Sequence, residues 1–333
     1  MINPSIPLVE LHRHLDGNVR LETILDISRK HNLPLPAKDI EGLRPFIQVT
    51  DSKSSILDYF AKFEWLVKSM VDYDAVHRIA YENVEDASNE GIDYIELRFS
   101  PWFMAEKNGL NPAGIVEAVI DGVKTGSRDF GVKTNLIGII SRTYGPEIGK
   151  KELEALLTQR EQIIALDLAG DEIHFSGELF VEHFKRARDA GWLSDPHAGE
   201  VCGPASIWQA IRELGADRIG HAVHAIEDEK LMDYLAEHQI GIESNLTSNV
   251  QTSTVKDYPS HPLKIFLERG IPASINTDDP GISACFLKHE YDIAAPAANL
   301  TAAQIEQAQL NAINTAFLST SEKAELWMKK KKS

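Results

Sequence analysis

The sequence predicts an α/β protein built as a closed (β/α)8 TIM barrel with a helical insertion after the first strand. Short apolar runs alternate with longer amphipathic segments along all 333 residues. Such alternation is typical of parallel strands joined by helices. Eight strand–helix units occur without a Pro-, Gly- or Ser-rich linker between them. Because a barrel of this size is often one domain, we expect residues 1–333 to form a single domain.

The expected strands are short and mostly apolar. They lie at residues 8–12, 92–99, 135–141, 163–169, 218–223, 240–244 and 273–277, with a less distinct strand directly before His197. Amphipathic helices are expected at residues 113–130, 178–190, 205–214, 228–237 and 262–268. Several of these helices are expected to stop at a glycine, since that residue adopts left-handed backbone angles without penalty: Gly191, Gly215, Gly241 and Gly270.

The connection between the first two strands is too long for an ordinary barrel loop. It covers residues 18–90 and contains helical patterns at 55–71 and 74–89. We expect this insertion to lie over the C-terminal mouth of the barrel as a lid. Its aromatic residues are candidates for an apolar lid surface, although plain helix packing also explains them: Phe60, Phe63 and Trp65.

The amino-acid composition limits the classes of binding partner that the protein can have. The formal net charge of −16 disfavours nonspecific nucleic-acid binding and docking on anionic membranes, which both need basic surfaces. No signal peptide or membrane span is apparent. The two cysteines, Cys202 and Cys285, lack a Cys-x-x-Cys spacing. We therefore expect a cytoplasmic protein with neither nucleic acid nor membrane as partner, and no protein partner can be inferred.

Two histidines near the N-terminus are spaced for one metal ion. His12 and His14 follow the run Ile6-Pro7-Leu8-Val9-Glu10. On a strand they point to the same face, with Cα atoms roughly 6.6 Å apart. Imidazoles at that spacing can converge on one cation. Two solvated histidines near a flexible terminus are the alternative interpretation.

Other chemically capable residues recur at the ends of the expected strands. Because the C-terminal strand ends of a barrel encircle one site, these residues should meet in space: Asp167, Gly170, Asp171, His197, Glu200, His221, Asp278 and Asp279. Each has an ordinary explanation when taken alone, as a loop residue, a core imidazole, a helix start or a turn. Their common position at successive strand ends instead indicates one functional site.

The residue types suit a hydrolytic metal centre. Nitrogen and oxygen ligands without a thiolate fit Zn²⁺, although other divalent metals also remain open. Such an ion lowers the pKa of a coordinated water from 15.7 towards about 7. One further histidine and two carboxyl groups could move protons and orient a substrate. The candidate ligands are His12, His14, His197 and Asp278.

Over nearly its whole length, the chain closely resembles the adenosine deaminases of the bacterial type. The resemblance is carried by six motifs: Leu11-His12-Arg13-His14-Leu15-Asp16-Gly17, Ile95-Glu96-Leu97-Arg98-Phe99-Ser100-Pro101, Asp167-Leu168-Ala169-Gly170-Asp171-Glu172, His197-Ala198-Gly199-Glu200, Ile219-Gly220-His221 and Ser274-Ile275-Asn276-Thr277-Asp278-Asp279-Pro280. It implies zinc-dependent deamination of adenosine, and of 2′-deoxyadenosine, to the inosine product and ammonia in purine salvage.

The resemblance also implies roles for individual residues. One zinc ion would be held by His12, His14, His197 and Asp278. Strand four has no lysine that could bridge two metals, so one ion is expected. Glu200 would protonate purine N1 as hydroxide attacks C6, and His221 would position the water and help to deprotonate it. The substrate would be bound at His14, with Asp279 at N7, the Gly170 N–H at N3 and Asp16 on the ribose.

Three departures from the family pattern are visible. Pro196 precedes His197 where an apolar strand is usual, and proline is rare in central strands. Strand five is therefore expected to end early, with His197 on a bulge or loop. Ala222 replaces a common Gly, which would be strained at positive φ. Asn245 replaces a common Cys, and the sequence does not explain this change.

Two other functions remain open. One is a deaminase of another 6-aminopurine, such as adenine or an adenine nucleotide. Related adenine deaminases usually carry Glu where this chain has Asp16, and the shorter acid leaves room for a sugar. A nucleotide would need a phosphate site, and no Gly-rich phosphate loop is present. The other is a catalytically impaired purine-binding protein with a metal site weakened by Pro196.

Overall fold

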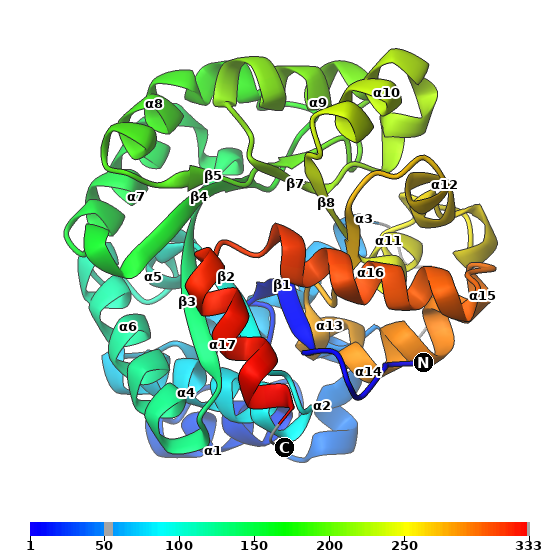
Figure 1. Ribbon diagram of the computed structural model, residues 1–333. Coiled ribbons are helices and arrows are strands. Elements are labelled where there is room, and N and C mark those ends of the chain that lie inside the picture. Colours follow the sequence, from blue (N-terminus) through cyan, green and yellow to red (C-terminus); the bar gives the residue numbers. More distant parts are fainter. Residues whose placement is uncertain (50–55, 332–333) are drawn as a thin grey trace.

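Parallel strands form an inner wall and helices surround them (Figure 1). The structure is a computed structural model that describes residues 1–49 and 56–331. The strands are β1 (Val9–His14), β2 (Tyr94–Phe99), β3 (Lys133–Ser141), β4 (Ile163–Ala169), β5 (Leu193–Ser194), β6 (His197–Ala198), β7 (Arg218–His221), β8 (Gly241–Ser244) and β9 (Ala273–Ile275). They pair in parallel as β1-β2-β3-β4-β5 and β6-β7-β8-β9. This is the expected (β/α)8 barrel.

The fifth barrel strand is divided into β5 and β6 at Pro196. Proline has no backbone N–H to donate, so regular pairing stops there. The wall nevertheless continues, because Asp195 N donates to Leu166 O (2.9 Å) and Gly220 N donates to Pro196 O (3.0 Å). The strand ends early as the sequence predicts. His197 itself begins β6 instead of lying on a loop.

The first and last strands meet at the site end of the barrel. Asp278 N donates to His12 O and His14 N donates to Asp278 O, both at 2.8 Å. These bonds continue the pairing beyond the end of β9. They place Asp278 directly beside β1, although more than 260 residues separate the two in sequence.

Seventeen α-helices occur within the described residues. They are α1 (Leu21–His31), α2 (Ile40–Ile47), α3 (Ile56–Ser69), α4 (Tyr73–Asn89), α5 (Pro101–Glu106), α6 (Pro112–Phe130), α7 (Gly145–Leu157), α8 (Val181–Asp189), α9 (Pro204–Gln209), α10 (Glu229–Glu237), α11 (Leu246–Gln251), α12 (Leu263–Glu268), α13 (Pro280–Ser283), α14 (Leu287–His289), α15 (Ala295–Ala297), α16 (Ala302–Thr315) and α17 (Thr320–Lys330). In the view of Figure 1, α16 and α17 lie in front of the strands, on the side of both chain termini.

The segment between β1 and β2 is helical, as expected, and contains α1–α4. From α3, Tyr59 and Phe63 line the main cavity of the barrel. Trp65 is half-buried against the core, and the Lys68 ammonium lies 4.2 Å from its ring centroid. Trp65 thus serves ordinary helix packing. The side chain of Phe60 lies outside the described residues.

The barrel interior contains buried charges as well as apolar side chains. Parallel strands covered on both faces are usually almost wholly apolar. Here β1 contributes Glu10 and His12, and β2 contributes Glu96 and Arg98, all fully buried. Buried charges need partners, and their pairing leads to the site described next.

None of the helices in residues 1–49 and 56–331 has the length and apolar character required to cross a membrane.

Candidate metal centre and pocket

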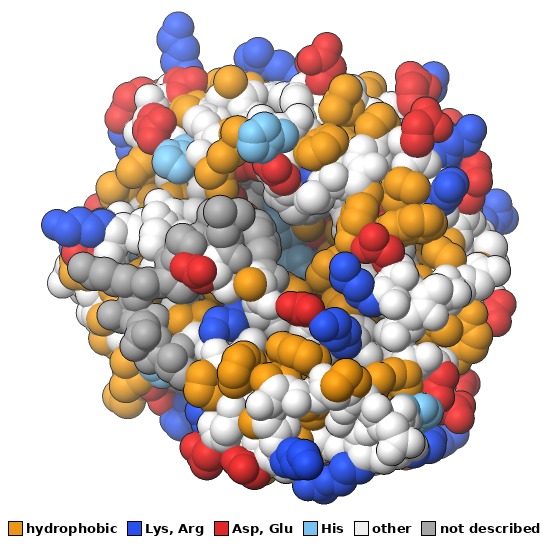
Figure 2. Space-filling model, turned by 180° about the vertical axis from the view of Figure 1, so that it is seen from behind, with side chains coloured by type: hydrophobic (Ala, Val, Ile, Leu, Met, Phe, Trp, Pro, Cys, Tyr) orange, Lys and Arg blue, Asp and Glu red, His pale blue; other side chains and the backbone are white. Residues whose placement is uncertain are grey.

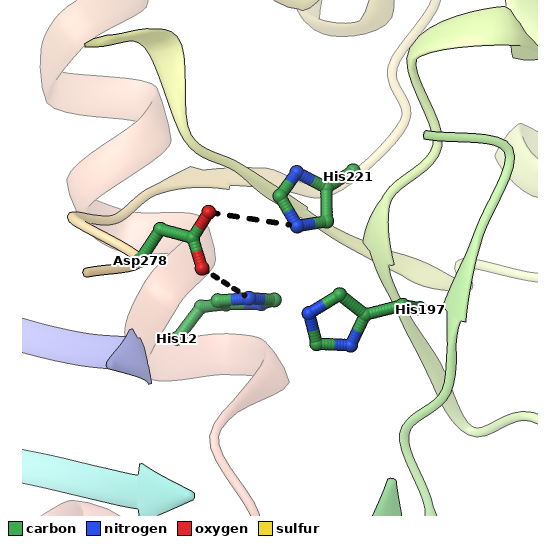
Figure 3. A group of neighbouring side chains, drawn as sticks. All are labelled: His12, His197, His221 and Asp278. Carbon is green, nitrogen blue, oxygen red and sulfur yellow. Dashed lines mark ion pairs between the residues drawn. The ribbon is translucent and has the colours of Figure 1, made fainter. Parts of the chain in front are cut away.

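Three histidines and an aspartate converge on one point at the C-terminal end of the barrel. His14 Nε2 lies 3.3 Å from His197 Nε2 and 3.3 Å from Asp278 Oδ1. His12 Nε2 also lies 3.3 Å from Asp278 Oδ1. Tetrahedral ligands at about 2.0–2.1 Å from a zinc ion are themselves about 3.3 Å apart. These distances therefore suit a single small cation. Figure 3 draws three of the four residues, His12, His197 and Asp278.

His221 stands beside the same cluster at slightly longer range. Its Nε2 lies 3.8 Å from Asp278 Oδ2 and 3.9 Å from Glu200 Oε2. One group of potential ligand atoms within 4.8 Å joins it with His12, His197 and Asp278. His14 has the shorter distances to His197 and Asp278, so it fits the fourth ligand position better. Figure 3 shows His221 next to the cluster, with one ring nitrogen directed at Asp278.

Two of the histidines are oriented by buried carboxylates. His12 Nδ1 pairs with Glu243 Oε2 at 2.6 Å, and His197 Nδ1 pairs with Asp167 Oδ1 at 2.8 Å. Each pairing places the ring proton on Nδ1 and leaves Nε2 with a lone pair towards the centre. Within the described chain, the buried Nε2 of His12 has no hydrogen-bond partner. A metal ion would satisfy that atom.

Burial keeps these two imidazoles uncharged. It lowers the pKa of His12 well below its usual range, and the neighbouring Arg98 charge lowers it further. Burial also lowers the pKa of His197 to about 3 in spite of Asp167. Neutral imidazole is the form that binds a metal.

A single guanidinium joins the two orienting carboxylates. Arg98 Nη1 donates to Asp167 Oδ2 at 2.9 Å, and Nη2 donates to Glu243 Oε2 at 2.7 Å. Arg98, Asp167 and Glu243 are fully buried. Sequence reasoning placed Asp167 at the site without a specific role and did not single out Arg98 or Glu243. The signal that could have identified them in the sequence is the presence of charged residues inside otherwise apolar strands.

Strained backbone presents several site residues. The φ angles are +64° at His221, +49° at Ala222 and +67° at Asp278. Such angles are uncommon outside glycine and concentrate at functional sites. The positive φ that the sequence anticipates for Ala222 is thus present. The two left-handed residues also explain why β7 ends at His221 and not at residue 223.

Two glycines make room for site side chains. A Cβ on Gly17 would lie 1.8 Å from Asp279 Oδ1, and one on Gly220 would lie 2.9 Å from His12 Cε1. Neither distance is compatible with a real side chain. Glycine at these two motif positions therefore lets the backbone lie close to the neighbouring site side chains.

A cavity of about 270 Å³ opens beside the metal centre. Figure 2 shows a hollow in this face of the molecule, with histidine at its base. Of the residues that the sequence places at the site, His12, Asp167 and Asp171 do not line the cavity, and the others do. The lining consists of His14, Asp16, Tyr59, Phe63, Ser100, Phe103, Ile139, Ser141, Thr143, Tyr144, Ala169, Gly170, His197, Glu200, His221, Thr252, Asp278 and Asp279.

The loop that carries Glu200 is held by a second glutamate. Glu172 accepts hydrogen bonds from the backbone N–H groups of Gly199 (2.6 Å), Val201 (2.9 Å) and Cys202 (3.0 Å). Burial raises the pKa of Glu200, so that its protonated form is favoured. Glu172 had no predicted role, although it ends one of the six motifs.

Asp279 is a buried carboxyl group at the cavity wall. Burial, together with the charge of Asp278, raises its pKa well above the usual range. Its Oδ2 accepts from Tyr59 OH at 3.0 Å. Its Oδ1 has no partner among the described residues. This carboxyl group can therefore bind a polar atom of a ligand.

Comparison with known proteins identifies one enzyme family. The family model "Adenosine deaminase" matches residues 7–332. A protein named adenosine deaminase from Escherichia coli O1:K1 is 58% identical over 326 residues, which cover 98% of each chain. The protein of that name from Edwardsiella ictaluri has the same identity and coverage.

Solved structures show the same fold. An adenine deaminase from Arthrobacter aurescens has a TM-score of 0.91 at 24% identity, with 98% of each chain covered. An N6-mAMP deaminase from Arabidopsis has a TM-score of 0.83 at 27% identity, with 99% of each chain covered. An amidohydrolase from a Burkholderia species, solved with bound Zn, has a TM-score of 0.87 at 24% identity, with 98% of this chain and 90% of that chain covered.

Replacing Arg98 should weaken metal binding. In Arg98→Gln the Asp167 and Glu243 carboxylates lose their shared cation, so the two histidines are held less firmly. Loss of such outer partners lowers metal affinity by about 10–100-fold. The measurement is zinc affinity by competition with a chromophoric chelator, alongside thermal unfolding.

The matched control is Arg218→Gln. Arg218 is also buried and pairs with Glu96, Asp195 and Glu243, so it shares Glu243 with Arg98 but does not contact Asp167. We expect a similar loss of stability with a smaller loss of affinity. Unchanged zinc affinity in a folded Arg98→Gln protein would contradict the role of Arg98.

Metal binding should displace a proton from His14. Burial disfavours the charge on His14, but Asp279, Asp16 and Asp278 together raise its pKa to about 9. Below that pH the metal-free ring is protonated, so affinity should rise with pH by about tenfold per unit up to the pKa. Calorimetry with zinc in two buffers of different ionisation enthalpy counts the protons released. His14→Gln should release about one proton fewer, and equal counts would refute the assignment.

Proposed function

The chain belongs to the adenosine deaminase family, and we propose that a single zinc centre at His12, His14, His197 and Asp278 serves its reaction on purine nucleosides. The family is metal-dependent, and the enzyme is a hydrolase that converts adenosine to inosine and ammonia. The observation that carries the zinc proposal is the set of 3.3 Å separations between ligand atoms. The proposal is also supported by the two imidazole rings that buried carboxylates hold in orientation.

The donor set fits zinc. Three nitrogens and one carboxylate oxygen without a thiolate are suitable ligands for that ion. When bound there, zinc would lower the pKa of water so that a nucleophile is available at neutral pH. Asp278 suits the anionic ligand, because its neighbouring histidines hold its pKa well below the usual range despite burial.

Glu200 is proposed as the proton donor to purine N1. Burial raises its pKa, as suits a general acid, and protonation of N1 withdraws electron density from C6. Glu200 Oε2 lies 3.9 Å from His221 Nε2. His221 thus stands between Glu200 and Asp278, where it can orient the attacking water.

Three further groups are proposed to hold the nucleoside. The free Oδ1 of protonated Asp279 can donate to N7, and the Gly170 N–H can meet N3. Asp16 Oδ2 accepts from Ser100 N at 3.1 Å, and its other oxygen can accept from a ribose hydroxyl. Both ribose and 2′-deoxyribose are compatible with this scheme.

A nucleoside suits the cavity better than a nucleotide. The described residues that line it include four carboxylates and no lysine or arginine. A phosphate dianion would therefore enter without a cationic partner. We further propose that residues 1–333 act as one domain and that residues 18–90 cover the barrel mouth, as the approach of Tyr59 and Phe63 to the cavity suggests.

Removing the acid of Glu200 should separate catalysis from metal binding. Glu200→Gln keeps the shape of the side chain but has no transferable carboxyl proton. We expect kcat for adenosine to fall about 10²–10⁴-fold with zinc content unchanged. Ultraviolet absorbance follows the turnover, and elemental analysis follows the metal. Parental turnover by the variant would refute the assignment.

The zinc-loaded enzyme should act poorly on a substrate that carries a charged group at the 5′ position. Burial of an unpaired phosphate costs several kcal/mol, so kcat/KM for AMP should lie at least about 100-fold below that for adenosine. Assays at equal zinc content should compare adenosine, 2′-deoxyadenosine, adenine and AMP. AMP turnover within about tenfold of adenosine would contradict the nucleoside preference.

A further inference from the structure

A chain of buried hydrogen bonds runs from the start of α12 to His221. Leu263 N donates to His261 Nδ1 at 3.1 Å. His261 Nε2 lies 3.1 Å from Asn249 Oδ1, and Asn249 Nδ2 lies 2.9 Å from His221 Nδ1. The side chains of all three linked residues are buried. None of the predicted roles involves Asn249 or His261.

The direction of the chain follows from its first link. A backbone N–H can only donate, so His261 Nδ1 must accept from Leu263. A neutral His261 then carries its proton on Nε2 and donates it to Asn249 Oδ1. Burial lowers the pKa of His261 to about 3 and thereby keeps the ring neutral. The amide nitrogen of Asn249 consequently faces His221.

An amide nitrogen is also only a donor, so His221 Nδ1 accepts. Neutral His221 must then carry its proton on Nε2, the nitrogen that faces the reaction site. Asn245 Nδ2 lies at almost the same distance from both ring nitrogens, 3.3 Å from Nδ1 and 3.4 Å from Nε2, so it does not distinguish the two tautomers.

We propose that Asn249 and His261 are positioning residues that fix His221 as the Nε2–H tautomer, with that N–H directed at the reacting oxygen. The proposal rests on the proposed function of the site. His221 then orients the attacking water by donating a hydrogen bond. Because Nε2 already carries a proton, His221 cannot accept the proton of the water, and its part in the reaction is to orient that water.

The backbone conformation of His221 shows why other residues are needed to orient its ring. His221 and Ala222 have φ angles of +64° and +49°, so regular strand geometry does not set the direction of the ring. In Figure 3 the ring nitrogen away from Asp278 points out of the ligand cluster. Asn249, on the helix that follows β8, contacts the ring at Nδ1.

The test combines tautomer and turnover in the zinc-loaded protein. In ¹⁵N-histidine-labelled wild type, NMR should show His221 protonated at Nε2 and unprotonated at Nδ1, with the signal assigned by its loss in His221→Gln. Asn249→Asp keeps the shape but replaces the donor with an acceptor. The proton of His221 should therefore move to Nδ1, and kcat should fall at least about tenfold while KM changes by less than about twofold.

The matched control is Asn245→Cys, which removes the other amide near the His221 ring and leaves Asn249 in place. It should retain the Nε2–H tautomer, with kcat within about threefold of wild type. If Asn249→Asp does not fold, His261→Phe frees the Asn249 amide to rotate and should give a mixed tautomer with reduced kcat. Both measurements, the tautomer and kcat, are expected to change while the zinc content stays the same.

Two results would overturn the proposal. The first is a wild-type His221 protonated at Nδ1. The second is an Asn249→Asp variant that retains both the wild-type tautomer and kcat. Failure of the proposed function is separately visible, because a zinc-loaded wild type that left adenosine unchanged would still report the tautomer of His221.

Discussion

The ion pairs of one buried guanidinium hold the centre of this molecule together. Arg98 on β2 joins Asp167 on β4 to Glu243 on β8, and these two carboxylates orient His197 and His12. Three buried charges would be costly if unpaired. Because these charges are paired, the two carboxylates hold the two histidine rings in fixed positions once the barrel has closed. The candidate metal centre therefore depends on strands that supply none of its four proposed ligands.

Adjacent aspartates acquire opposite properties from their surroundings. Asp278 is buried among histidines that hold its pKa well below the usual range. Asp279 is buried too, and the charge of Asp278 raises its pKa well above that range. One carboxyl group is thus an anion suited to a metal, and the next holds its proton more tightly. Separation of neighbouring pKa values in this manner is typical of catalytic sites.

The barrel tolerates irregular backbone where the site requires it. Pro196 interrupts the fifth strand, yet hydrogen bonds on both sides of it keep His197 in the wall. His221, Ala222 and Asp278 hold left-handed angles at strand ends. Strain of about 1–3 kcal/mol per residue persists only where surrounding contacts over-determine the conformation. Here the serine hydroxyl of Ser248, 2.6 Å from Asp278 Oδ2, is one such contact.

The sequence by itself determined the fold class and the residues that gather at the barrel mouth. Strand periodicity placed His12 and His14 on one face, and strand ends placed Glu200 and Asp279 near them. These are local properties, so local patterns reveal them. Only the tertiary structure decided which groups support the site, such as Arg98 and Asn249. Their partners are distant in sequence, and a charged residue inside an apolar strand does not disclose which buried group it will meet once the barrel closes.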